Sequence, residues 1–185
     1  DECSMVDILL MYSLLKAVPK AELHLHGEAA LSRSTIEQLY QHATGTPMSD
    51  ETFTSLFAYN DLPGFLTSFI AIQNYFSRLD DLAFIMRDVG TYMEENNIVY
   101  SEVFFSPTAH LRRGLAFEDL STIISGGIQD IARSSGRVIK VLVDVCRSFG
   151  LENAERNLDH VLNDRSGHII GIGLGGDEAK GPARD

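Results

Sequence analysis

Ile98-Val-Tyr-Ser-Glu-Val-Phe-Phe105, followed at once by Ser106-Pro107, is the stretch that decides the fold. Its β-branched and aromatic residues favour a β-strand, and the proline marks where the strand stops. The run is nearly continuous in β-prone residues instead of alternating strictly with polar ones. This pattern is typical of a strand that is covered on both faces, as in a parallel sheet.

Three other stretches have the same strand-like character, and helical spacing fills the segments between them. The expected strands are Glu22 to His26, Ile98 to Phe105, Val138 to Cys146 and His168 to Leu174. The expected helices are Ser34 to His42, Asp80 to Asn96, Phe117 to Ser134 and Leu151 to Leu162. Strands that alternate with helices predict an α/β fold with a parallel sheet. Four strands suit either a small doubly wound sheet or half of an eight-stranded barrel, and periodicity does not separate these two.

Composition excludes several classes of protein. The 185 residues are 44% hydrophobic and 22% charged, which is ordinary for a folded globular domain and disfavours disorder. The formal net charge of −11 repels phosphate backbones and anionic lipid surfaces, so neither a nucleic-acid polymer nor a membrane is an expected partner. The only cysteines, Cys3 and Cys146, suggest no disulfide framework, and a reducing cytoplasm fits best.

The apolar stretch Ile8 to Leu15 is the one segment that resembles an anchor. It is much shorter than the roughly 20 residues that a membrane-spanning helix needs, and acidic residues precede it where a signal peptide would be basic. We therefore expect a buried helix that leads into Pro19.

Two histidines on the first expected strand are the clearest candidates for metal binding. His24 and His26 are separated by one residue, and strand side chains alternate between faces, so both imidazoles project from the same face. Imidazole is a ready ligand of zinc, and catalytic zinc sites use about three protein ligands plus a water. A pair alone does not complete such a site, and two histidines can share a strand face by chance.

The sequence around this pair resembles the adenosine and adenine deaminases of the metal-dependent amidohydrolases. Pro19-Lys-Ala-Glu-Leu-His-Leu-His26, followed by Gly-Glu-Ala-Ala-Leu31, is similar to their first barrel strand, which supplies two zinc ligands. Further similar segments follow in the family's order, namely the helical lid at Leu62 to Phe69, the second strand at Tyr100 to Pro107, the third at Val141 to Arg147 and the fourth at Gly171 to Glu178. Ordered matches over nearly the whole chain are far more specific than any one of them.

The resemblance implies a role for each of several residues. His24 and His26 would be ligands of one zinc ion, and Glu28 would occupy the position where an Asp in many members contacts the ribose hydroxyls. Gly176 would present its backbone amide to a purine nitrogen, a role that suits glycine because it permits close approach. The apolar wall against the nucleoside would come from the lid residues Leu62, Phe65 and Phe69.

Simpler explanations exist for some of these residues. The charge of Glu28 would also favour the N-terminus of the helix that follows it. Phe65 and Phe69 lie four residues apart and share a helix face, and an aromatic pair at this spacing is more often core than pocket.

A glycine-rich segment near the end of the chain supports a rival interpretation. Gly171-x-Gly173-x-x-Gly176 matches a dinucleotide-binding fingerprint after a predicted strand. However, Asp185 follows too soon for the helix and the acidic residue that this motif needs about 20 residues further on. Among the other histidines only His110 follows the carboxyl end of a strand, where barrel active sites form, and a surface loop explains it equally well.

The resemblance also predicts an incomplete site. A complete barrel needs about 250 residues and eight strands, so residues 1–185 are expected to form the first half of a (β/α)8 barrel, with a helical lid inserted near residues 48–78. In the family the remaining metal ligands and the proton-transferring residues lie on later strands, so no catalytic residue is assigned before Asp185. The isolated chain is expected to be inactive, and its open sheet edges would favour self-association.

The implied function is hydrolytic deamination at C6 of an adenine ring, with one zinc ion as cofactor and a small purine nucleoside or base as ligand. Two departures leave the substrate open between adenosine, adenine and a modified adenine nucleoside. Gly173 stands where the family's fourth strand commonly has an Asp, and Ala29 and Ala30 replace a Gly-Ser or Gly-Thr pair. The alternatives are a noncatalytic α/β module with a vestigial histidine pair and a Rossmann-like nucleotide-binding domain.

Overall fold

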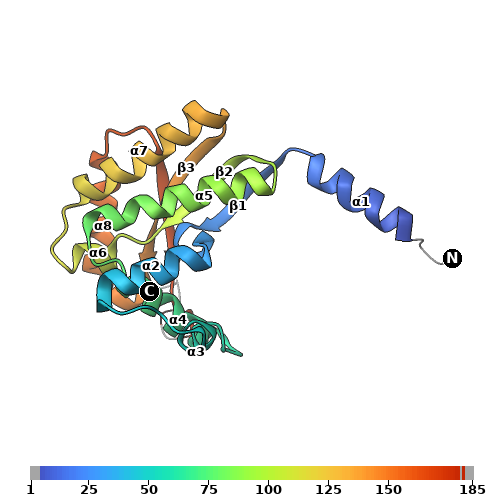
Figure 1. The fold of residues 1–185 in the computed structure, drawn as a ribbon. Coiled ribbons are helices and arrows are strands. Elements are labelled where there is room, and N and C mark those ends of the chain that lie inside the picture. Colours follow the sequence, from blue (N-terminus) through green and yellow to red (C-terminus); the bar gives the residue numbers. More distant parts are fainter. Residues whose placement is uncertain (1–4, 180, 182–185) are drawn as a thin grey trace.

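The computed structural model describes residues 5–179 and residue 181, and its strands alternate with helices (Figure 1). The strands are β1 (Lys20–His26), β2 (Ile98–Phe105), β3 (Val138–Cys146) and β4 (Ile169–Gly175). The α-helices are α1 (Met5–Ala17), α2 (Arg33–Thr44), α3 (Asp50–Ser55), α4 (Leu62–Asn74), α5 (Ala83–Glu95), α6 (Thr108–Leu111), α7 (Phe117–Ser135) and α8 (Leu151–Asn163). Short 3-10 helices are η1 (Gly27–Ala30), η2 (Leu79–Leu82) and η3 (Arg147–Phe149). The expected strands and main helices are confirmed within a few residues at each end.

The four strands form one parallel sheet in the order β1-β2-β3-β4. Each strand pairs with the next one along the chain, so the strand order never reverses. A doubly wound sheet binds its nucleotide where the order does reverse, and the described sheet contains no such point. The Rossmann-like alternative is therefore wrong, whereas sequential parallel strands are the arrangement of a (β/α)8 barrel.

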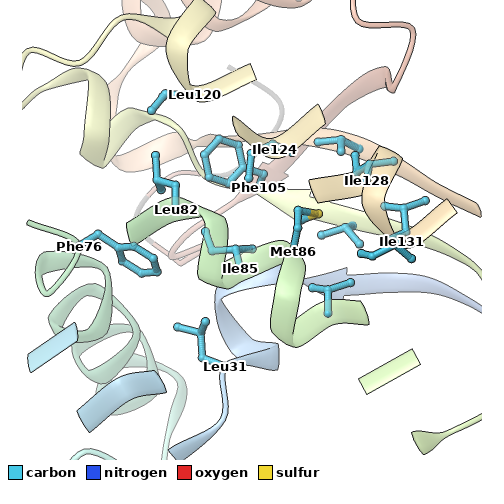
Figure 2. Packing of buried hydrophobic residues seen from close by; sticks show 14 of the residues in the cluster. Leu31, Phe76, Leu82, Ile85, Met86, Phe105, Leu120, Ile124, Ile128 and Ile131 are labelled. Atoms are coloured by element: carbon cyan, nitrogen blue, oxygen red, sulfur yellow. The ribbon is translucent and has the colours of Figure 1, made fainter. Parts of the chain in front are cut away.

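Helices cover one face of this sheet and form the hydrophobic core with it. Helix α5 packs on β2, α7 packs on β3, and α8 packs on both β3 and β4. Figure 2 shows Met86 of α5 and Ile128 of α7 within this cluster, with Phe105 of β2 close by. The opposite face of the sheet carries the histidines of β1, Phe104, Asp144 and the glycines of β4. In a closed barrel this second face would be the interior.

Local sequence signals fix the two ends of helix α2 and its attachment to α5. Helix α2 begins at a cap in which the Ser32 side chain accepts a hydrogen bond from the Thr35 amide, and it ends at Gly45, whose φ of 76° is left-handed. The buried Asp88 carboxylate of α5 accepts hydrogen bonds from the Ser32 amide, at 2.8 Å, and from the Thr35 hydroxyl, at 2.5 Å. These bonds tie α2 to the helix layer.

Helix α1 corrects one expectation. The segment Ile8 to Leu15 is helical as predicted, but it is not buried, because α1 projects away from the body of the molecule (Figure 1). The large apolar side chains of residues 8–15 are each 53–64% exposed, since they lie on every side of the helix and no single face could cover them. Among the described residues no helix has the length and apolar character to cross a membrane. Cys3 lies outside the described residues.

Candidate metal and substrate site

The histidine pair lies on the uncovered sheet face, at the carboxyl end of β1. The ring centroids of His24 and His26 are 5.4 Å apart, and His24 stacks on Phe104 of the neighbouring strand at 4.5 Å. The Nδ1 atom of His26 is buried and has no hydrogen-bond partner. Burial lowers the pKa of His26, with Asp144 opposing the shift and His24 adding to it. A neutral imidazole of this kind is the form that binds a metal.

Glu28 is buried directly after the strand, in η1. Only 1% of the residue is exposed, and its Oε1 accepts hydrogen bonds from Gln73 Nε2 and from the Ser106 amide, both at 3.2 Å. Burial raises the pKa of Glu28 to about 7, against the effect of these hydrogen bonds. The other oxygen, Oε2, is buried without a partner. Glu28 lies in the first turn of the 3-10 helix η1, whereas the N-terminus of α2 is capped by the side chain of Ser32.

Asp144 lies beside His26, and the sequence alone did not single it out as a candidate site residue. It lies near the carboxyl end of β3, is 8% exposed, and its Oδ2 is 3.9 Å from Nδ1 of His26. The Ser106 hydroxyl donates to the same oxygen at 3.3 Å. Burial raises the pKa of Asp144, and the charges of His26 oppose that shift. The available signal was a single carboxylate that interrupts the apolar run of this strand.

Glycines on β4 leave the space that the Asp144 carboxylate occupies. A Cβ atom added at Gly175 would lie 2.7 Å from Oδ2 of Asp144, and one added at Gly173 would lie 2.5 Å from the Phe104 ring. Neither contact is sterically possible without movement. The glycine-rich end of the chain thus makes room for side chains of neighbouring strands, a role that its dinucleotide-like pattern did not suggest.

The residues expected to form the lid differ in how close they lie to His26. Helix α4, which carries the residues expected to form the lid, contacts η1 and therefore lies at the carboxyl end of β1. The Phe69 ring approaches His26 edge-on at 6.0 Å, and Phe65 is 5.9 Å from Phe69. Both phenylalanines are half-buried and lie outside the main core cluster. Leu62, at the start of α4, is exposed.

Gly176 occupies the turn immediately after β4, at the same end of the parallel sheet. Its φ of +94° is in the region that favours glycine. An added Cβ would lie 3.1 Å from Sγ of Cys146 and 3.2 Å from Cγ of Arg147, so a side chain would be crowded here as well as strained.

His110 is not a surface-loop residue, which corrects the second interpretation of that histidine. It is fully buried in α6, where its ring stacks on Phe105 at 5.8 Å and meets Phe76 edge-on. Arg113 donates a hydrogen bond to its Nδ1 at 3.0 Å. Because Phe105 faces the helix layer, His110 belongs to that layer and not to the face that carries His26.

These groups can supply part of a metal site. Two imidazoles face the same space, and one of them has a buried nitrogen that lacks a partner, which suits a pair of zinc ligands. Among the described residues, no three His, Cys, Asp or Glu side chains are grouped so that they could hold a metal ion. The residues therefore fit zinc as two of its ligands.

Comparison with known sequences identifies the family. The sequence model of the adenosine deaminase family matches residues 19–185. An adenine deaminase from Pseudomonas savastanoi is 30% identical over 179 residues, which cover 93% of this chain and 55% of that protein. An uncharacterized deaminase from Schizosaccharomyces pombe is 30% identical over 174 residues, covering 91% of this chain and 50% of its own length. The chain thus spans about half the length of the curated relatives it matches.

Comparison with solved structures agrees with the comparison of sequences. An amidohydrolase with bound zinc from Burkholderia ambifaria superposes with a TM-score of 0.86 at 25% identity, over 99% of this chain and 50% of that one. An adenine deaminase from Arthrobacter aurescens gives 0.79 at 25% identity, over 90% and 51%. An Arabidopsis protein in complex with GMP gives 0.77 at 19% identity, over 92% and 53%, a likeness in fold alone.

The four sequential parallel strands therefore correspond to the N-terminal half of a (β/α)8 barrel, as the sequence predicted. The histidine pair, the buried Glu28 after it and helix α4 all lie at the carboxyl end of β1, and the carboxyl ends of the strands are where active sites of this fold are built. Together with the match over residues 19–185, these features show that the chain belongs to the adenosine deaminase family.

Proposed function

We propose that this chain forms half of the active site of a zinc-dependent hydrolase that removes ammonia from C6 of an adenine ring. The substrate would be adenosine, adenine or a modified adenine nucleoside, and the reaction would belong to purine metabolism in the cytoplasm. The observation that carries the proposal is the pair His24 and His26, which lie on one sheet face and are followed by the buried Glu28. Activity is expected of the whole protein and not of residues 1–185 alone.

Zinc would be held by His24 and His26 together with ligands outside this chain, and when bound it supplies the Lewis acidity that makes water a nucleophile at neutral pH. The chain's own residues would bind and orient the purine. Phe69 and Phe65 would exclude water from the ligand, which raises the strength of polar contacts inside the site. The Phe69 ring lies edge-on to His26 and Phe65 lies against Phe69, and this arrangement supports the role.

Glu28 would recognise a polar group of the substrate. Its Oε1 is already engaged by Gln73 and by the Ser106 amide, which fixes the plane of the carboxyl group. Its Oε2 is buried and unpartnered, so it can take a hydrogen bond from a substrate hydroxyl or amine without first losing one. Gly176 would bring its backbone amide close to the purine ring, as its conformation and lack of Cβ permit.

The test measures ammonia release from adenine, adenosine and an N6-substituted adenine nucleoside by the full-length protein. The protein is assayed as purified, after chelation, and after zinc is restored, with the metal content determined at each stage. We expect activity to disappear on chelation and to return with zinc, and we expect His24→Ala to lose both metal and activity.

Two outcomes would contradict the proposal. A full-length protein that binds zinc at neither histidine would instead be a noncatalytic member of the fold. Rapid zinc-dependent ammonia release by residues 1–185 alone would overturn the claim that the remaining ligands lie outside this chain. Gln38→Lys, an exposed substitution on α2, serves as the matched control for handling and folding.

A further inference from the structure

Asp144 is an unusual residue for its position. It is a carboxylate with 8% exposure on a strand whose neighbouring side chains are mostly apolar. Burying a carboxylate is costly unless hydrogen bonds or an opposite charge compensate. One compensating bond comes from the Ser106 hydroxyl at 3.3 Å. A single bond from a neutral hydroxyl leaves most of the acceptor capacity of this group unused.

The ring of His26 has a nitrogen that lacks a hydrogen-bond acceptor. Its Nδ1 is buried and lacks a partner, and the Asp144 oxygen Oδ2 lies 3.9 Å from it. A closer approach of about 1 Å would bring the two atoms into the normal hydrogen-bond range. Such a bond would satisfy both groups at once.

Strand β4, next to β3, leaves space for the Asp144 carboxylate at Gly175. A Cβ at residue 175 would lie 2.7 Å from Oδ2 and 2.9 Å from Oδ1 of Asp144, so any side chain there would push the carboxylate away from β4. Gly175 has an ordinary backbone conformation and is not needed for a turn. The unpartnered nitrogen of His26 on β1 and the missing side chain of Gly175 on β4 therefore both face the carboxylate of Asp144 on β3.

From these contacts we infer that Asp144 is a positioning residue for His26. Its carboxylate accepts a hydrogen bond from Nδ1–H, which fixes the ring in the tautomer whose Nε2 carries the free lone pair. Nε2 is then the nitrogen that faces a metal. A carboxylate that orients a metal-binding imidazole typically contributes 10–100-fold to metal affinity. The inference rests on the proposed metal-binding role of His26.

The tautomer of His26 can be measured without any metal. Nitrogen-15 NMR of the imidazole ring at about pH 8, where an ordinary histidine is neutral, shows which nitrogen bears the proton. We expect proton on Nδ1 in the wild-type chain and in Asp144→Asn, whose amide oxygen still accepts the bond. In Asp144→Ala the proton should move to Nε2, while the shifts of the His24 ring stay close to those of the wild type. An unchanged His26 ring in Asp144→Ala overturns the inference.

Zinc affinity gives a second readout. In competition with a chromophoric chelator, Asp144→Ala should bind zinc about 10–100-fold more weakly than the wild type, and Asp144→Asn should restore part of the loss. Gly175→Ala should mimic Asp144→Ala because the added methyl group displaces the carboxylate. Equal affinity in all variants contradicts the positioning role. A wild-type protein that binds no zinc contradicts the proposed function instead, and the tautomer measurement still decides the inference.

Discussion

At the scale of single residues, burial controls the chemistry of several histidines and acids. His110 and Glu28 are the extreme cases, since each is almost completely enclosed and each has its pKa moved toward the neutral form. Burial is the largest cause of both shifts. A side chain of either kind can therefore be recognised only from the fold, because the same residue in a loop would titrate normally.

His110 yields a prediction about the pH dependence of stability. Burial lowers its pKa to about 4, and the charge of Arg113 adds to this shift. The unfolded chain then binds a proton on this residue more readily than the folded chain does. The free energy of unfolding is therefore unaffected by this residue above the ordinary histidine pKa of about 6.5. As pH falls from there toward 4, protonation of the unfolded chain lowers the free energy of unfolding by about 3 kcal/mol in total.

Urea unfolding at a series of pH values would measure this contribution. His110→Asn keeps an acceptor for the Arg113 guanidinium but cannot titrate, so its free energy of unfolding should fall less steeply between about pH 6.5 and 4. If wild type and variant lose stability in parallel over this range, the burial of His110 does not control its pKa.

Sequence patterns singled out candidate residues that lie in one short motif. They did not reveal residues whose surroundings depend on contacts between distant segments. His24 and His26 were found because strand alternation fixes their common face. Asp144 and Gln73 were missed because their importance depends on which strand or helix lies beside them. No local pattern states that Asp144 approaches His26, since 118 positions of sequence numbering separate them and only strand pairing brings them together.

At the scale of elements, two adjacent glycines in α7 allow a matched test of packing. A Cβ at Gly127 would lie 2.5 Å from Cβ of Met86 on α5, whereas a Cβ at Gly126 would meet nothing within 4 Å. Gly127→Ala should therefore destabilise the protein by about 1–3 kcal/mol through overpacking. Gly126→Ala should stabilise it by about 0.5–1 kcal/mol, because alanine favours a helix more than glycine does.

Thermal or urea unfolding of the two alanine variants side by side would test this contrast. Both changes add one methyl group to the same helix, so differences in helix propensity cancel in the comparison. Equal effects of the same sign would show that α5 and α7 are less closely packed than the structure indicates.

Element types were predictable from sequence because strand and helix periodicities are strong and distinct. The position of α1 was not, since its apolar residues lie on every side and give no face with which to dock. The boundary between η2 and α5 was also missed, and residues 80–96 were expected to form one helix. The buried Asp81 accepts hydrogen bonds from the Ser77 and Arg78 amides and thereby holds the first turn in a tighter form.

At the scale of the whole molecule, the described sheet has two unpaired edges and an apolar outer surface beside one of them. On β4 the outward residues Ile170, Ile172 and Leu174 are each about half exposed. We propose that residues 1–185 self-associate through this region when they are isolated, because an open edge with apolar flanks is a template for pairing.

Ile172→Lys should weaken that association. The lysine places a charge on the exposed side of β4 and discourages pairing at the edge. Sedimentation velocity over a range of concentrations should show a smaller associated fraction than in Gln38→Lys, which introduces the same charge on α2. The two variants should behave identically if another surface, such as α1, carries the association.

The sequential strand order also has a consequence for the route by which the chain folds. The segments that join β2 to β3 and β3 to β4 are short compared with residues 27–97, which separate β1 from β2. Closing a longer loop costs more chain entropy, so β2, β3 and β4 should assemble before β1 joins them. Pulsed hydrogen exchange should then detect protection in residues 138–146 before residues 20–26. The strand that carries both histidines would dock last, and a folding intermediate would therefore have a sheet before His24 and His26 take their places on it.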